Sequence, residues 1–127
     1  MAYDLEYSLG MYEQAFTQAD HDSVADYLRD NKLFASAMNN PAFRAMVRER
    51  LVDLSEGAFE PSRVLGELDG WWETWRLWNE LSNRRFALDM ELAELEYELA
   101  RKFLAERPDY ILAFYDEHVM AYGDAAE

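Results

Sequence analysis

Two carboxylates near the N-terminus have the residue type and spacing to bind a divalent cation. Asp4 and Glu6 lie two residues apart in the segment Tyr3–Gly10, where apolar and polar residues alternate up to a glycine. In an extended chain both side chains project to the same side, so their hard oxygen atoms could share one ion such as Mg²⁺. Spacing alone favours the alternative of a solvated pair, because acidic pairs are common on protein surfaces.

The sequence contains no other familiar catalytic pattern. It has no cysteine, no glycine-rich phosphate loop and no Gly-x-Ser-x-Gly elbow. Asp20-His21-Asp22 lacks the glycine and glutamate offsets of a calcium loop, and we interpret it as a helix cap. His118 has no partner histidine and is interpreted as a core-edge or surface side chain. We therefore predict no catalytic residue.

Four tryptophans form the most unusual stretch of the sequence. On a helix, Trp71, Trp75 and Trp78 share one face and Trp72 lies about 100° away, so the four cannot all enter one side of a core. Packing at a helix junction is the ordinary interpretation, because aromatic residues dominate cores. A surface that contacts a protein partner or stacks on a sugar is the alternative.

Composition restricts the partners of the protein that carries these residues. The 127 residues include 26 Asp and Glu against 12 Lys and Arg, a net charge of −14, and 50% are hydrophobic. Clustered Lys and Arg are missing, which argues against nucleic acid and anionic membrane surfaces as partners. The sequence has no signal-peptide pattern and no apolar stretch of transmembrane length, so as written we expect a cytoplasmic protein.

Apolar residues recur at intervals of three and four along most of the chain, while glycine and proline number only 5 and 3. This pattern predicts an all-α protein, a helical bundle or a C-lobe-like helical domain. We expect one domain over 1–127, with a short extended arm over 1–16 and two helices within 20–57. A helical hairpin and a C-terminal helix are expected over 60–122.

Capping residues set the expected ends of the first two helices. N-cap residues precede Val24, so a helix is expected from Ser23 to about Asn40. Pro41 suits the first turn of the next helix, which is expected to end at Gly57.

The stretch after the first tryptophan is too long for one helix in a globular chain. Residues 71–106 contain no glycine or proline, and one helix over them would run roughly 50 Å, against a domain diameter of about 35 Å. We expect a break at 79–83, where Asn and Ser lower helix propensity. The alternative is a long helical hairpin that protrudes or forms a dimer. A last helix is expected after Pro108. Between the break and Pro108 a helix is expected with an apolar face at steps of four and three: Leu88, Leu92, Leu95, Leu99 and Phe103.

Four short motifs occur in the order in which one known family carries them. They are Tyr3-Asp4-Leu5-Glu6-Tyr7-Ser8-Leu9-Gly10, Asn40-Pro41-Ala42-Phe43-Arg44, Phe59-Glu60-Pro61-Ser62-Arg63-Val64 and Phe103-Leu104-Ala105-Glu106-Arg107-Pro108-Asp109-Tyr110. Their order resembles that in the C-terminal part of the CotH-type atypical protein kinase family, named for a spore coat protein. The resemblance spans nearly the whole chain.

The resemblance implies roles for the two N-terminal carboxylates. Asp4 falls on the family's metal-binding acid, the counterpart of the Asp in the Asp-Phe-Gly segment of protein kinases, which holds Mg²⁺ against the nucleotide phosphates. Glu6 would be a second or supporting ligand. The family transfers phosphate from ATP to protein, so Mg²⁺ is the one cofactor that the resemblance implies.

The resemblance also implies that the chain is inactive alone. The family's nucleotide-binding lobe, its phosphate-contacting basic residue and its catalytic-loop acid lie N-terminal to the Asp-x-Glu segment, where the sequence has only Met1-Ala2-Tyr3. The alternative is a stand-alone acidic helical module, whose N-terminal arm and Trp71–Trp78 stretch contact a protein partner or a second copy. An acidic inhibitor of a basic partner is a third possibility that rests on charge alone.

Overall fold

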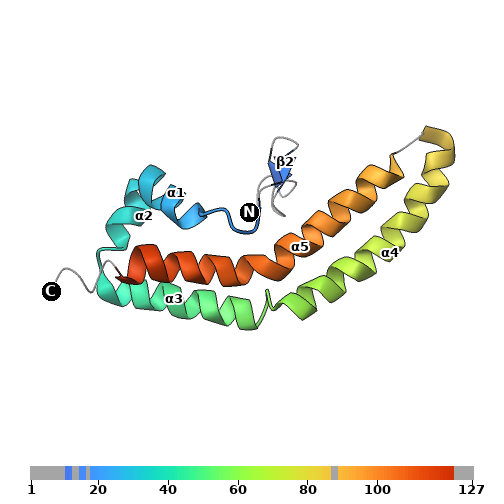
Figure 1. Ribbon diagram of the computed structural model, residues 1–127. Helices are drawn as coiled ribbons and strands as arrows, with labels where there is room; N and C mark the ends of the chain where they lie inside the picture. The colour runs from blue at the N-terminus through green and yellow to red at the C-terminus, as the bar shows by residue number, and fades with distance from the viewer. Residues whose placement is uncertain (1–10, 13–14, 17, 87–88, 122–127) are drawn as a thin grey trace. The chain divides into compact units, whose positions relative to one another are not determined.

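Residues 11–12, 15–16, 18–86 and 89–121 are the part of the chain that the computed structural model describes. The elements, shown in Figure 1, are β1 (Met11–Tyr12), β2 (Ala15–Phe16), α1 (Ser23–Asp30), α2 (Lys32–Ala37), α3 (Pro41–Glu56), α4 (Pro61–Phe86), α5 (Met90–Tyr115) and the π-helix η2 (Asp116–Met120). The all-α class is confirmed. The two strands are an antiparallel pair of two residues each, and most of the predicted arm over 1–16 lies outside the described residues.

The backbone is divided into two compact units. Unit 1 comprises Met1–Ala19 and Pro61–Ala105, and unit 2 comprises Asp20–Glu60 and Glu106–Glu127. The helix α5 contributes its first part to unit 1 and its last part to unit 2. The prediction of one domain over 1–127 stays a prediction.

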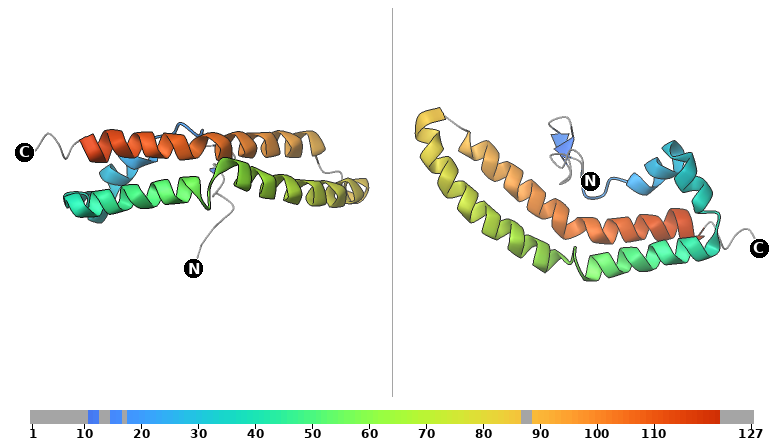
Figure 2. Two further views of the ribbon diagram at one scale, coloured as in Figure 1. Left: turned by 90° about the horizontal axis from the view of Figure 1, so that it is seen from below. Right: turned by 180° about the vertical axis from the view of Figure 1, so that it is seen from behind.

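In unit 1, α4 and the first part of α5 lie side by side as an antiparallel hairpin (Figure 2). The predicted break at 79–83 is wrong, because α4 continues to Phe86. The Asn79 amide donates to the Trp75 carbonyl at 3.0 Å, so this residue bonds within the helix that it was expected to end. The next helix, α5, begins after Asp89, whose carboxylate accepts from the Leu92 N–H at 2.9 Å and caps it.

In unit 2, the segment predicted as one helix from Ser23 to Asn40 forms two, α1 and α2. Asn31 between them has extended backbone (φ −113°, ψ 94°), and its side chain accepts from the Phe34 N–H at 3.0 Å. An asparagine that caps a new helix in this way interrupts the previous one. The second predicted helix, from Pro41 to Gly57, is confirmed as α3.

The prediction that a new helix follows Pro108 is wrong, because Pro108 lies inside α5. A proline in a helix interior removes one hydrogen bond and typically costs about 3 kcal/mol. Ile111 and Phe114 in the following turn pack against the core of unit 2, and this burial opposes the cost of continuing the helix. The helix then widens into η2, which ends at Met120.

The core of unit 2 is built around Tyr115, which is only 1% exposed. The other buried members are Val24, Met38 and Val119. The Tyr115 hydroxyl donates to the Arg44 carbonyl at 3.0 Å, so α5 is joined to α3 by a hydrogen bond as well as by apolar contact. None of the described helices is both long and apolar enough to cross a membrane.

Candidate functional site

The two predicted metal ligands, Asp4 and Glu6, lie outside the described residues. Within the ranges that the structure describes, no group of three or more His, Asp or Glu side chains is placed to hold a metal ion. The Mg²⁺ assignment therefore stays a prediction from the resemblance.

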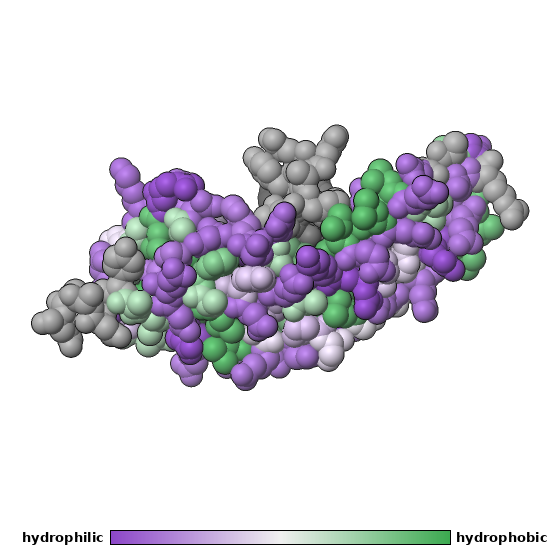
Figure 3. Space-filling model, in the orientation of Figure 1, coloured by the Kyte–Doolittle hydropathy of each residue, from purple (hydrophilic) through white to green (hydrophobic). Residues whose placement is uncertain are grey.

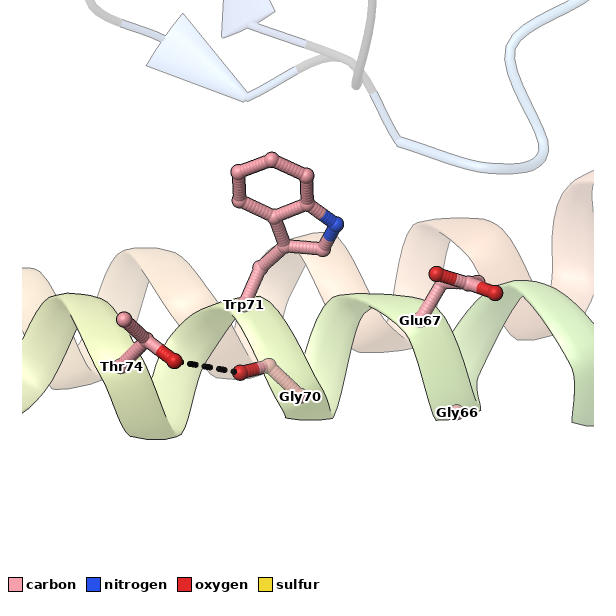
Figure 4. Close-up of a pocket in the computed structure, with 5 residues that line it drawn as sticks. All are labelled: Gly66, Glu67, Gly70, Trp71 and Thr74. Atoms are coloured by element: carbon pink, nitrogen blue, oxygen red, sulfur yellow. Dashed lines mark hydrogen bonds between the residues drawn. The ribbon is translucent and has the colours of Figure 1, made fainter.

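The four tryptophans of α4 are divided between two environments. Trp71 and Trp78 are 74% and 65% exposed and Trp75 is 45% exposed, and Figure 4 shows Trp71 standing out from the helix. Trp72 turns toward α5, where its ring stacks on Tyr97 with centroids 4.3 Å apart and planes 8° apart. Trp75 also stacks on Trp72, with ring centroids 5.2 Å apart, whereas Trp71 and Trp78 stand out from the helix. Helical periodicity predicts this separation of Trp72 from Trp71 and Trp78. Packing at a helix junction describes Trp72 and part of Trp75, and does not describe Trp71 and Trp78.

A polar contact behind Trp72 fixes the register of α4 and α5. Asp69 accepts hydrogen bonds from Arg101 and, at 2.7 Å, from the Tyr97 hydroxyl. The Arg101 guanidinium also lies over the Tyr97 ring, 5.6 Å from its centroid. The Arg101 hydrogen bond, followed by that of Tyr97, lowers the pKa of Asp69, while burial and the bond to Asp69 raise the pKa of Tyr97. The helix α4, on which the exposed tryptophans lie, is thus fixed to α5 by contacts on its opposite face.

Part of the predicted apolar face of α5 is exposed. Leu92 and Leu95 are 49% and 54% exposed, Leu99 and Phe103 are partly buried, and Leu88 lies outside the described residues. Tyr97 and Arg101, which do not belong to the predicted face, contact α4. Figure 3 shows a hydrophobic patch over this part of α5. Sequence reasoning missed Asp69, Tyr97 and Arg101. The four-residue spacing of Tyr97 and Arg101 was the only local signal in the sequence. This signal is not specific, because a tyrosine and an arginine one turn apart also occur on solvated helix faces.

A shallow groove of about 400 Å³ runs along α4 beside Trp71. Its lining residues, drawn in Figure 4, are Gly66, Glu67, Gly70, Trp71 and Thr74. The Thr74 hydroxyl donates to the Gly70 carbonyl at 3.3 Å, so this polar group is bonded within the helix. The groove thus presents bare glycine backbone, one indole ring and one carboxylate. These groups suit contact with an apolar side chain that lies next to a positively charged one. They offer no nucleophile and no proton-transfer pair.

A second polar cluster lies in unit 2 and holds α1 to α5. The Arg107 guanidinium donates to the His21 carbonyl and to the Ser23 hydroxyl, each at 2.5 Å, and burial lowers the pKa of Arg107. Asp22 caps α1 by accepting from the Ala25 N–H at 2.9 Å, which confirms the interpretation of this segment as a helix cap. Its other carboxylate oxygen lies 2.5 Å from His118 Nε2.

An ion pair between Arg48 and Asp116 joins α3 to η2. Two hydrogen bonds of 2.6 and 2.8 Å connect the guanidinium with both carboxylate oxygens, and they lower the pKa of Asp116.

The pKa of Asp22 is lowered as well. Burial alone would raise the pKa of Asp22, but its hydrogen bonds with Ala25 and His118 lower it. Both carboxylates therefore stay charged in the folded protein at a pH where an unfolded Asp, with a pKa of about 3.9, takes up a proton.

These lowered pKa values predict acid sensitivity of unit 2. The stabilisation from Asp22 and Asp116 is fully present above the unfolded pKa of about 3.9 and is lost as the pH falls through the lowered folded values. We expect the urea midpoint to drop steeply below about pH 4. Asp116→Asn should lower the midpoint at neutral pH and flatten this drop. An unchanged pH profile in the Asp116→Asn variant would contradict the prediction.

A family model described as CotH kinase protein matches residues 1–111. The chain belongs to the CotH kinase protein family. Neither the curated proteins nor the solved structures gave a match. The matched range contains both candidate metal ligands, Asp4 and Glu6, and all of α1 to α4.

Two of the motifs that carry the CotH resemblance lie at helix ends and contacts of unit 2. Asn40 caps α3 by accepting from the N–H groups of Ala42 and Phe43 at 3.0 and 3.2 Å. Arg44 donates to the Met38 carbonyl at 3.2 Å. In the last motif, Arg107 bonds to the start of α1, as described above. In the described part of the chain, these CotH motif residues make structural contacts that fix helix ends.

Proposed function

We propose that the chain is the C-terminal helical part of a CotH-like protein kinase, in which Asp4 binds Mg²⁺ and Glu6 supports it. The family match over residues 1–111 is the observation that carries this proposal, because it includes both carboxylates. Two carboxylates are the hard oxygen donors that suit Mg²⁺. In protein kinases the ion neutralises charge on the phosphates during transfer.

The proposal assigns no catalytic residue to these 127 residues. Phosphoryl transfer requires several positioned groups to act together on the nucleotide, the metal and the acceptor hydroxyl. We therefore expect the chain by itself to transfer no phosphate. Incubation with labelled ATP and Mg²⁺ tests this, and label on the chain or on an added acceptor protein that disappears with Asp4→Asn would contradict it.

The metal assignment has its own test. Titration with Mg²⁺ is expected to shift the amide resonances of Asp4 and Glu6 in a saturable manner, and Asp4→Asn is expected to abolish the shift. Asp20→Asn, which removes an exposed carboxylate elsewhere, is the matched control and should leave the shift unchanged. A lack of any shift in the unmodified chain, or an equal loss in both variants, would rule out Asp4 as the ligand.

A second function, contact with a protein partner through α4, is favoured by the exposure of Trp71, Trp75 and Trp78. Tryptophan is enriched at protein interfaces and among the residues that dominate their binding energy. These side chains lie on one face of a helix that is braced by the contact of Trp72 with Tyr97. The chain would in this case act as an acidic helical interaction or dimerisation module.

A further inference from the structure

The exposed side of α4 carries a regular stripe of six residues, here called the α4 stripe. Its members follow one another at steps of four, three, four, three and four: Glu67, Trp71, Thr74, Trp78, Leu81 and Arg85. All six are exposed. This alternation is the spacing of the contact seam between two packed helices.

Two glycines lie beside the α4 stripe, and no neighbour among the described residues explains either of them. Gly66 and Gly70 lie inside α4, and a Cβ added at either position would meet nothing within 4 Å. A glycine in a helix interior costs about 1 kcal/mol relative to alanine. Both line the groove next to Trp71 (Figure 4), so the space that they leave is open to a side chain from another molecule.

The two ends of the α4 stripe carry opposite charges. Glu67 begins it and Arg85 ends it, and neither makes an ion pair within the described ranges, although the Arg85 guanidinium lies 5.3 Å from the Phe86 ring centroid. Two antiparallel copies of the stripe, related by a two-fold axis at its midpoint, place Glu67 of each copy level with Arg85 of the other. The charges at the ends therefore attract each other when the two copies are antiparallel, whereas like charges meet when the copies are parallel.

The apolar middle of the α4 stripe is complementary in the same arrangement. Trp78 of one copy comes level with Thr74 of the other, where Gly70 leaves the groove open, and Trp71 comes level with Leu81. Each copy thus supplies both the large side chain and the hollow that receives it, which is the knobs-into-holes relation of packed helices. Such a contact uses the same surface on both copies, so the assembly is complete as a dimer.

We propose that a second copy of this chain docks antiparallel on the α4 stripe to form a two-fold dimer. The proposal rests on the second proposed function, that α4 is a contact surface. With up to about 250 Å² per ring, the exposed parts of Trp71, Trp75 and Trp78 supply roughly 400 Å² per chain. A standard interface takes about 800 Å² per partner, and the exposed Leu77 and Leu81 beside them add to the area.

The charge pairing gives the sharpest test. The mass of the full chain is measured by light scattering and sedimentation over a range of concentrations for the unmodified protein, E67R, R85E and the double variant E67R/R85E. We expect a dimer of the unmodified chain, with a dissociation constant that rises about tenfold in each single variant, because like charges then meet at both ends. The double variant, in which opposite charges meet again, should regain the original constant.

Two apolar variants separate the proposal from the function on which it rests. Trp78→Ala is expected to abolish the dimer, and Leu92→Ala, an exposed apolar residue of α5, is the matched control that should leave it intact. Circular dichroism checks that each variant folds. A chain that is monomeric at every concentration overturns the proposal and leaves the Mg²⁺ titration unaffected.

Two further outcomes of these measurements would also overturn the antiparallel dimer. A dimer that Trp78→Ala breaks, but that ignores the charge variants, overturns the antiparallel pairing and keeps α4 as a contact surface. A dimer that survives Trp78→Ala overturns both the pairing and the second proposed function.

Discussion

Replacing Tyr115 by alanine is expected to lower the free energy of unfolding by about 3–5 kcal/mol, the largest effect of any single substitution in unit 2. The side chain is 1% exposed and lies among Val24, Met38 and Val119, so its removal leaves a cavity where α5 meets the first helices. Urea unfolding followed by far-ultraviolet circular dichroism measures the loss.

The matched control at this position is Tyr115→Phe. It keeps the ring and removes only the hydroxyl that donates to the Arg44 carbonyl at 3.0 Å, so the expected loss is about 1 kcal/mol. Similar, small losses in Tyr115→Ala and Tyr115→Phe would show that the ring does not fill the core of unit 2.

The second large effect is expected in unit 1 from Trp72→Ala. The Trp72 ring stacks between Trp75, at 5.2 Å, and Tyr97, at 4.3 Å, and connects α4 with α5. Because Trp72 is only partly buried, we expect a loss of about 2–3 kcal/mol in the free energy of unfolding, below the about 3–5 kcal/mol of a fully buried tryptophan.

Trp71→Ala is the control for the same residue type on the same turn of helix. Trp71 is 74% exposed, so its removal should change the free energy of unfolding by less than about 0.5 kcal/mol. Both variants are compared by urea unfolding at concentrations low enough to keep the chain monomeric. Equal losses in the two variants would contradict the division of the tryptophans between a packed face and an exposed face.

Several features of the fold could be predicted because they depend on neighbours within about four residues. Asn40 and Pro41 start α3 as expected, and Asp22 caps α1. The separation of Trp72 from Trp71 and Trp78 likewise follows from the helical period alone. The order of four motifs was enough to indicate the family, which the match over residues 1–111 confirms.

Other features could not be predicted because they depend on residues far apart in the sequence. Asn79 was expected to end a helix on propensity, but propensity is weak beside the packing that holds α4 against α5. Pro108 was expected to begin a helix, but Ile111 and Phe114 bury against the core only if α5 continues. In each case a tertiary contact outweighs a local preference.

The sequence by itself determined the all-α class, the caps at Asp22 and Asn40, and the separation of Trp72 from Trp71 on α4, because backbone hydrogen bonding and side-chain direction in a helix are local properties. Only the tertiary structure decided that α5 turns Tyr97 and Arg101 toward α4 and leaves Leu92 and Leu95 exposed. The apolar period marks a face that is able to pack. Which face packs depends on the partner helix, where Asp69 and Trp72 offer a hydrogen-bond acceptor and a ring that leucine cannot match.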